Sequence, residues 1–419
     1  MRRWLILAVA AMAAVTVIGP PPGLALTVTT CALLAAGVRR RDAWSIVYLV
    51  LAAALAGVAT VRAADWLVGW CVVAAVLLAA LASAGGASWR QVVVGLVPRP
   101  ALVVLRAPVA VTPSAGWRHP LTAAAIAAVL LAVFVPLFAS ADAAFAHLLG
   151  ELVPDDAVDD PVARLAVWLA FVLVGGALLT ARTAMPAAPG TPRLTQLEWA
   201  VPLAVLVALV AAFVALQLTT LYGGHDHVLR TAGLTYAEYA REGFAQLLAA
   251  AALTLAVIAA AVRWTAPSRL RTVLLVALCV LTLAVLASAL TRLDLYMDAY
   301  GFTRLRLSAQ ATILWLGGVF TLILVARGAA WLPRATVALT AATLLAFAVS
   351  NPDLRIAERN LDRYERTGRL DERTLEGLSA DAAPALVDHR ALTECPLPDG
   401  VAGFNLGRSR AREALGCPG

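Results

Sequence analysis

Residues 201–221 read VPLAVLVALVAAFVALQLTTL, and this stretch decides the class of fold. It contains twelve Leu, Val or Phe residues and no charged residue. At about −0.3 to −0.6 kcal/mol each, these side chains favour insertion of the stretch into a bilayer by roughly 4 to 7 kcal/mol. The stretch is also long enough to cross a bilayer, because a hydrocarbon core needs about 20 helical residues. The sequence therefore predicts a membrane-spanning helix here.

Similar apolar runs recur along the whole chain of 419 residues. Charged residues make up only 14% of the sequence, whereas a soluble protein carries about 25%. This composition disfavours a soluble enzyme, because too little polar surface would face water. We predict an all-α, polytopic transmembrane helical bundle of about eleven spans, with a small helical C-terminal extramembrane tail. The predicted spans are residues 4–18, 24–38, 43–61, 66–83, 121–138, 161–181, 199–221, 245–262, 272–291, 307–325 and 334–349.

The two ends of this series leave alternatives open. The first two runs are short and are separated by the Pro-rich residues 20–23, so a re-entrant hairpin could replace two spans. The start also has the features of a signal peptide, with Arg2 and Arg3 before an apolar run, so cleavage is a further alternative. Residues 334–349 could instead lie on the membrane surface, which would move the tail to the cytoplasm.

The distribution of arginines predicts the orientation of the spans. All 33 basic residues are arginines, and with a cytoplasmic N-terminus sixteen of them fall in cytoplasmic segments and seven in the opposite loops. Because basic residues are enriched in cytoplasmic loops, we predict a cytoplasmic N-terminus and, after eleven spans, an extracytoplasmic tail. The arginines are scattered between apolar runs, so no nucleic-acid partner is predicted and the bilayer is the expected partner. A composition rich in Ala, Arg, Gly and Pro suggests a bacterial plasma membrane.

Three regions follow from the alternation of apolar and polar segments. Residues 1–118 form an N-terminal transmembrane region of about four spans with a basic cytoplasmic loop. Residues 119–349 form a core bundle of about seven spans, and residues 350–419 form the tail.

The tail is predicted to contain three short helices. Helical spacing of apolar residues follows Asn351 and ends at Gly368, Asp371 can cap a second helix, and residues 379–381 begin a third. Cys395 and Cys417 are the two cysteines outside the apolar runs. In an oxidising compartment we expect them to form a disulfide.

The spans themselves carry few groups that could support chemistry. Ionisable residues are essentially absent near the span centres, which disfavours a proton- or ion-coupled transporter. Gln217 and Gln310 are polar residues at depth, and helix packing is their expected role. His225-Asp226-His227 is too small a group for a firm metal site, and no phosphate-binding glycine motif is present. We therefore predict no cofactor, no metal and no catalytic residue.

Polar side chains gather instead at four helix ends, all of which the predicted topology places on the extracytoplasmic side. On a continuous helix, Asp294 and Asp298 would share one face, and Tyr296 and Tyr300 another. Arginine can hold an anionic headgroup or sugar phosphate through two hydrogen bonds, and tyrosine can stack on a ligand. The alternative is that these charges pair with one another and cap helix ends. The candidate ligand-binding residues are Asp142, Tyr236, Glu238, Arg241, Asp294, Tyr296, Asp298, Tyr300, Arg304, Arg306, Asn360 and Tyr364.

Four stretches at these helix ends carry a resemblance to a known family. They read FVPLFASADAAF at 134–145, TYAEYAREGF at 235–244, LYMDAYGFTRLR at 295–306, and NPD at 351–353, continuing through NLDRY at 360–364 to AD at 380–381. In this order they resemble bacterial multi-pass membrane proteins of the DUF4153/DUF4173 type. The resemblance implies a plasma-membrane protein without an assigned reaction, so it supports the fold and location and leaves the function open.

Three functions are compatible with these features. The leading hypothesis is a non-enzymatic cell-envelope protein that binds an anionic or lipid-linked ligand, or a partner protein, at an extracytoplasmic polar rim. The alternatives are a transporter, which would need a central cavity, and a membrane enzyme acting on lipid-linked substrates. The enzyme would need Asp142, Glu238, Asp294 or Asp298 as an acid or base at an accessible groove.

Overall fold

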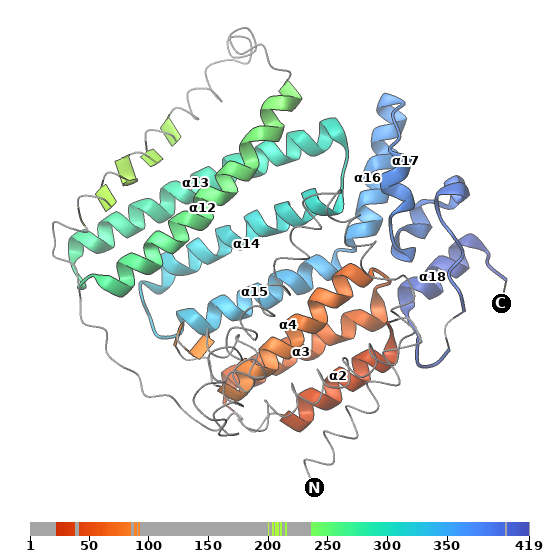
Figure 1. The fold of residues 1–419 in the computed structure, drawn as a ribbon, viewed down its shortest axis with the longest axis horizontal. Helices are drawn as coiled ribbons and strands as arrows, with labels where there is room; N and C mark the ends of the chain where they lie inside the picture. Colours follow the sequence, from red (N-terminus) through yellow and green to blue (C-terminus); the bar gives the residue numbers. More distant parts are fainter. Residues whose placement is uncertain are drawn as a thin grey trace, which may run out of the picture. The chain divides into compact units, whose positions relative to one another are not determined.

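The computed structural model describes residues 22–37, 42–84, 88–89, 91–92, isolated positions between 200 and 215, 236–398 and 400–418 (Figure 1). Within these ranges every regular element is a helix and no strand occurs, which confirms the predicted all-α class. Five of the described helices are long and apolar enough to cross a membrane, so the chain is an integral membrane protein. The predicted spans 4–18, 121–138, 161–181 and most of 199–221 lie outside the described residues.

The described helices fall into two compact units, and each is treated by itself. The first unit contains α2 (Leu24–Gly37), α3 (Ala43–Val61) and α4 (Asp65–Ala84) from Gly69 onward, together with residues 400–405. The second unit contains residues 62–68, which join α3 to α4, and residues 236–398 and 406–418. The predicted division into three regions stays a prediction.

In the first unit, a C-terminal segment completes the start of α2. The helices α2 and α3 pack on each other, and Thr27 Oγ1 donates to Ala56 O at 2.9 Å. The backbone N–H of Leu24 donates to Phe404 O at 3.0 Å. Residues 402–404 therefore accept hydrogen bonds from N–H groups that have no partner within their own helix.

In the second unit, four long helices follow one another, each packed on the next (Figure 1). Their core includes the buried side chains of Leu286, Leu293 and Phe320. The helices contain the predicted spans 245–262, 272–291, 307–325 and 334–349. They are α12 (Tyr236–Trp264), α13 (Arg269–Tyr300), α14 (Arg304–Ala326) and α15 (Leu332–Val349).

The helix α13 is longer than a bilayer is thick. Its 32 residues span about 48 Å at 1.5 Å per residue, whereas a hydrocarbon core is about 30 Å thick. The apolar part lies before Arg292, and the segment from Arg292 to Tyr300 is polar. The last third of α13 and the turn that follows it therefore extend beyond the hydrocarbon core.

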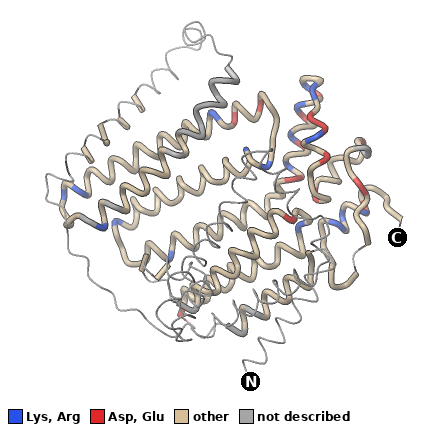
Figure 2. The backbone as a smooth tube through the Cα atoms, in the orientation of Figure 1, with Lys and Arg blue, Asp and Glu red and all other residues tan. Residues whose placement is uncertain are grey.

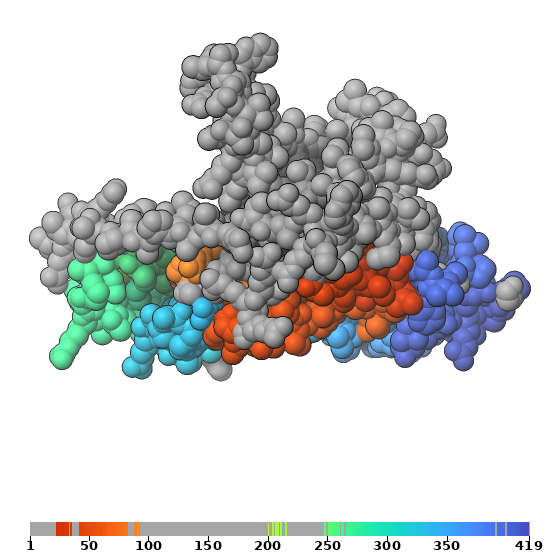
Figure 3. All heavy atoms as spheres, turned by 90° about the horizontal axis from the view of Figure 1, so that it is seen from below, coloured from red at the N-terminus to blue at the C-terminus, as the bar shows by residue number. Residues whose placement is uncertain are grey.

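The tail begins directly after α15 and consists of short helices. The side chain of Asn351 accepts the N–H of Leu354, Gly368 ends the first helix with φ +67°, and the side chain of Asp371 caps the second by accepting the N–H of Thr374. The helix nearest the C-terminus was not expected from the sequence. The tail helices are α16 (Pro352–Thr367), α17 (Glu372–Glu376), η3 (Ala380–Ala385), η4 (Val387–Leu392) and α18 (Leu406–Leu415). The residues after α16 carry the darkest blue in Figure 3.

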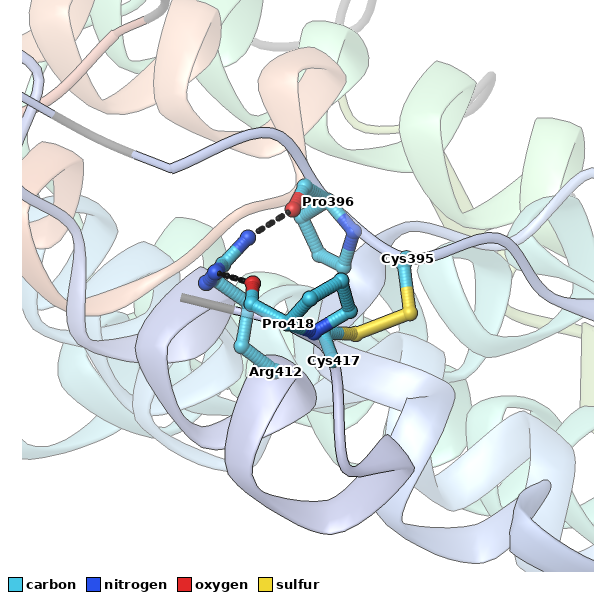
Figure 4. Close-up of a disulfide and its surroundings, with 5 residues drawn as sticks. All are labelled: Cys395, Pro396, Arg412, Cys417 and Pro418. Carbon is cyan, nitrogen blue, oxygen red and sulfur yellow. Dashed lines mark hydrogen bonds between the residues drawn. A yellow bond between two sulfur atoms is a disulfide. The ribbon is translucent and has the colours of Figure 1, made fainter.

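Cys395 and Cys417 form a disulfide in the second unit (Figure 4). Beside it, Arg412 of α18 donates to Pro396 O at 2.7 Å and also to Pro418 O. The covalent bond and the guanidinium together fasten α18 to the segment that starts at Cys395.

Candidate functional site

Three connections of the second unit meet at one end of its helices. They are residues 62–64 between α3 and α4, 301–303 between α13 and α14, and 350–351 between α15 and α16. We call this meeting point the junction, and it comprises residues 62–64, Trp66, 301–306, 351–360 and 379–381. Figure 2 shows charged positions, in blue and red, gathered along α16, whereas the middles of α13, α14 and α15 are uncharged.

A buried ion pair joins the tail to α14. Asp353, at the start of α16, has 0% of its surface exposed, and it accepts two hydrogen bonds from Arg304. The distances are 2.8 Å from Nε to Oδ1 and 2.6 Å from Nη2 to Oδ2, the two-pronged geometry that guanidinium and carboxylate favour. The N–H of Ser379 donates to the same carboxylate at 2.9 Å. Burial alone would raise the pKa of Asp353, but the bonds and charge of Arg304 hold it below its ordinary value.

A second buried carboxylate joins the tail to the start of α4. Asp381 accepts the backbone N–H groups of Ala63 at 2.7 Å and Ala64 at 3.1 Å. Burial raises the pKa of Asp381, and the two N–H groups and the charge of Arg62 offset part of that effect. A carboxylate in this place also complements the positive end of the α4 dipole.

Arg62 makes the complementary contact at the end of α15. Its guanidinium donates to Ala348 O at 2.9 Å and to Val349 O at 2.5 Å. These are among the last carbonyls of α15, which have no partner within the helix and carry its negative dipole end. Residues 62–64 therefore bind both the end of α15 and the tail.

Asn360 fixes the turn between α13 and α14. Its side chain accepts the N–H of Phe302 at 2.9 Å and donates to Phe302 O at 2.8 Å. Gly301 has φ +87°, and a Cβ there would lie 2.5 Å from Asn360 Oδ1. Glycine is therefore required at 301 both by the backbone conformation and by the close approach of Asn360. One turn later on α16, Arg363 donates to Ala299 O at 2.9 Å.

Beside this turn, three side chains form a partly exposed group that we call the rim: Tyr296, Tyr300 and Arg306. Arg306 donates to Tyr300 O, to Gly301 O and to the hydroxyl of Tyr296. Its guanidinium carbon lies 4.2 Å from the centre of the Tyr296 ring, and the Tyr296 and Tyr300 rings are 5.1 Å apart. Tyr300 is 44% exposed, so the rim offers a cation and an aromatic surface to a ligand.

The other candidate ligand-binding residues do not belong to the rim. Asp298, in the last turn of α13, is exposed. Asp294 accepts a hydrogen bond from Gln310 at 2.9 Å, so it links α13 to α14. Tyr364 is 38% exposed, and its ring lies 6.3 Å from that of His389. Asp142 lies outside the described residues. Tyr236, Glu238 and Arg241 belong to α12, but their side chains are not described.

The structure thus brings two of the four predicted segments together, 292–306 and 360–364. Of their residues, Arg304, Asn360 and Arg306 all make hydrogen bonds within the protein, and Arg306 forms a partly exposed surface together with Tyr296 and Tyr300. Whether these residues bind a ligand stays a prediction. No group of three or more metal-ligating side chains occurs in the described part of the chain.

Sequence reasoning missed four residues of the junction as site residues: Arg62, Trp66, Asp353 and Asp381. Trp66 lies beneath Arg304, whose guanidinium carbon is 5.6 Å from the ring centre. Asp353 and Asp381 do stand in the stretches that carry the family resemblance, which is the signal that could have selected them. No pattern in the sequence distinguishes Arg62 or Trp66.

A comparison with family models gives a match over most of the chain. The model described as a domain of unknown function (DUF4153) matches residues 23–389. No curated protein and no solved structure matches the chain. The matched range includes all the described helices from α2 to η3 and therefore the whole junction.

Proposed function

The chain belongs to the DUF4153 family, as its four stretches predicted, and we propose that it is a membrane protein that binds an anionic or lipid-linked ligand at the rim. The observation that carries this proposal is Arg306 stacked on Tyr296 beside the exposed Tyr300. A guanidinium held in place in this way can bind a phosphate or carboxylate, and the tyrosine rings can pack against a sugar or headgroup.

The junction gives the rim a fixed position. Asn360 holds the turn that precedes Arg306, and Asp353 holds Arg304 two residues before it. A ligand-binding group gains affinity when its supporting contacts already fix its geometry, because less freedom is lost on binding. In this proposal Arg306 contacts the ligand, while Arg304 and Asn360 position the turn.

We further propose that the protein resides in a bacterial plasma membrane, with the N-terminus in the cytoplasm and the rim and tail outside. The arginine distribution supports this orientation. The junction supports a separate part of the predicted topology, namely that the connections 62–64, 301–303 and 350–351 share one side of the membrane. A phosphatase that is active only outside the cytoplasm, fused after Gly419, should be active, and a fluorescent protein that folds only in the cytoplasm should stay dark. The reverse result would contradict the orientation.

The ligand proposal is tested by measuring binding of a fluorescent polyprenyl-phosphate-linked sugar to the full chain in nanodiscs. We expect Arg306→Gln to weaken binding at least about tenfold, because hydrogen bonds to charged groups contribute about 1.5 to 3 kcal/mol. Arg269→Gln is the matched control, since Arg269 is an exposed arginine at the other end of α13. An unchanged dissociation constant for Arg306→Gln would contradict the proposal.

The two alternatives, a transporter and an enzyme acting on lipid-linked substrates, remain untested. Solute flux in proteoliposomes would support the first. Turnover of the same labelled sugar lipid, abolished by Asp298→Asn, would support the second.

A further inference from the structure

The disulfide between Cys395 and Cys417 joins residues 22 positions apart and closes a loop that contains the whole of α18. Cys395 is exposed and Cys417 is partly exposed, so a thiol in solution can reach the bond. The other three cysteines, which we call the free cysteines, lie in apolar helices: Cys31, Cys71 and Cys279. Thiol–disulfide exchange in this chain is therefore expected at Cys395–Cys417.

The end of α18 that the disulfide holds is also the end that packs on η3. Ala411 and Leu415 of α18 are buried together with Ala383 of η3, and Cys417 packs against the same cluster. Through Ala382, η3 also packs on α16. The helix η3 therefore has two supports, and one of them is the part of α18 that the disulfide keeps in place.

The short helix η3 carries contacts on which the junction depends. Its Asp381 accepts the N–H groups of Ala63 at 2.7 Å and Ala64 at 3.1 Å. Directly before η3, the N–H of Ser379 donates to Asp353 at 2.9 Å. Because η3 has only six residues, a shift of the side that faces α18 also moves the side that holds these bonds. The disulfide is thus connected to the junction through a single turn-sized element.

Arg412 links the same two segments without a covalent bond. Its guanidinium donates to Pro396 O at 2.7 Å and also to Pro418 O (Figure 4). Each of these prolines directly follows one of the two cysteines. The hydrogen bonds do not involve sulfur, so they remain available when the disulfide is reduced. They would then keep the two thiols near each other, which allows the disulfide to form again.

We propose that Cys395–Cys417 is a reversible redox switch that controls the junction. A thiolate of a dithiol reductant attacks the sulfur of the exposed Cys395, and Cys417 leaves as a thiolate. The second thiol of the reductant then displaces Cys395 from the mixed disulfide. Two electrons and two protons thereby pass from the dithiol to the protein, and the reductant becomes a disulfide.

Reduction acts on the junction by removing one support of η3. The end of α18 gains conformational freedom when the loop is no longer closed. With less support, η3 moves away more often, and Asp381 then releases the N–H groups of Ala63 and Ala64. This switch does not require a ligand at the rim, so the two proposals can fail separately.

The test is hydrogen exchange at the N–H groups of Ala63 and Ala64 in the full chain in nanodiscs, with and without dithiothreitol. We expect reduction to speed exchange by about tenfold to a hundredfold, since a disulfide typically stabilises the structure that it cross-links by at least this factor. Reoxidation should restore the slow exchange. Exchange in the middle of α13 should not change, which checks that the chain stays folded. Mass spectrometry confirms that the bond has been reduced.

Two sets of variants show which cysteines are responsible. The double variant Cys395→Ser, Cys417→Ser should exchange as fast as the reduced wild type and should not respond to dithiothreitol. Replacing the free cysteines is the matched control and should keep the full response: Cys31→Ala, Cys71→Ala, Cys279→Ala.

Arg412→Gln tests the second link. In the oxidised chain it should change exchange at Ala63 and Ala64 little, because the disulfide still joins the two segments. In the reduced chain it should speed exchange about tenfold further, since hydrogen bonds from a charged group contribute about this factor.

Exchange at Ala63 and Ala64 that stayed the same after complete reduction would overturn the proposal, because the disulfide would then have no influence on the junction. Faster exchange that also included the middle of α13, or that reoxidation failed to reverse, would overturn it as well, because reduction would then unfold the chain instead of switching the junction.

Discussion

The middle of the second unit and the junction at its end are held together by different interactions. In the middle, apolar side chains such as Leu286 and Phe320 pack together, and hydroxyl groups such as that of Thr282 bond to carbonyls of their own helix. At the junction, Asp353 and Asp381 connect elements that are far apart in the sequence.

The difference matters because a bilayer provides no hydrophobic force between helices. Lipid tails are as apolar as the helix surfaces, so packing in the middle can be satisfied by many arrangements. The junction bonds are directional, and each one requires a particular partner. We therefore expect the apolar middles to determine that the helices insert, and the junction to determine which ends meet.

Breaking the ion pair should give the largest effect. Arg304→Gln leaves the fully buried Asp353 without its opposite charge. We expect a loss of about 3 kcal/mol, the lower end of the range for buried pairs, because Arg304 is 36% exposed. The Ser379 N–H donates a hydrogen bond to Asp353. Hydrogen exchange at this N–H should then speed up more than a hundredfold.

Two controls sharpen this prediction. Arg355→Gln removes an arginine of α16 without a partner in the described residues and should leave exchange at Ser379 unchanged. The double variant Arg304→Gln, Asp353→Asn removes both charges and should recover part of the loss. If the double variant were no better than the single one, charge burial would not be the cause.

Gly301→Ala should have the next largest effect, at the turn between α13 and α14. The substitution places a Cβ at φ +87° and 2.5 Å from Asn360 Oδ1. We expect a cost of about 2 kcal/mol, measured as faster exchange of the Phe302 N–H. Gly328→Ala is the matched control, because Gly328 has φ +86° but nothing within 4 Å of the added Cβ. Equal costs for the two variants would mean that the contact with Asn360 contributes nothing.

The two buried carboxylates should respond to pH in opposite directions. The pKa of Asp353 lies below its ordinary value of 3.8, so its contribution to stability is present above that pH and is lost as the pH falls through the folded-state pKa. The pKa of Asp381 lies above 3.8, so its contribution is present below that pH and is lost as the pH rises through its folded-state pKa.

We therefore expect acid to open the contact at the Ser379 N–H, and Asp381→Asn to leave this acid response in place. At the N–H groups of Ala63 and Ala64, raising the pH from below 3.8 through the folded-state pKa of Asp381 should weaken protection in the wild type but not in Asp381→Asn. Hydrogen exchange, corrected for the intrinsic pH dependence, measures both. An acid response at Ser379 that disappeared in Asp381→Asn would show that Asp353 is not its source.

The features that the sequence predicted are those that depend on neighbouring residues. The helix α3 has the bounds 43–61 that its apolar run predicted. The tail caps at Asn351, Gly368 and Asp371 also follow from local patterns, because a cap involves groups only a few residues apart. The helix α18 was missed, since Gly407 and three arginines within ten residues give a weak helical pattern.

Contacts between distant segments could not be predicted in this way. Arg304 and Asn360 were selected because they are polar and lie at helix ends, but nothing local shows that their partners are Asp353 and Phe302. Asp381 is separated from Ala63 by more than three hundred residues, so only the folded chain brings them together. The residues that flank an aspartate in the sequence do not reveal whether its carboxylate will be buried or exposed in the folded chain.

The smallest effect should come from the one hydrogen bond between α14 and α15 that can be removed while keeping an aromatic ring. Trp315 Nε1 donates to Thr340 Oγ1 at 3.0 Å, and Trp315→Phe removes the donor. Hydrogen bonds between helices within membranes contribute about 0.6 kcal/mol on average, because the separated helices find other partners. We expect a change of about threefold in the unfolding equilibrium, measured by denaturation in mixed micelles. A loss of stability as large as that from Arg304→Gln would contradict the difference between the two regions. The middle of the unit would then contain contacts as specific as those of the junction.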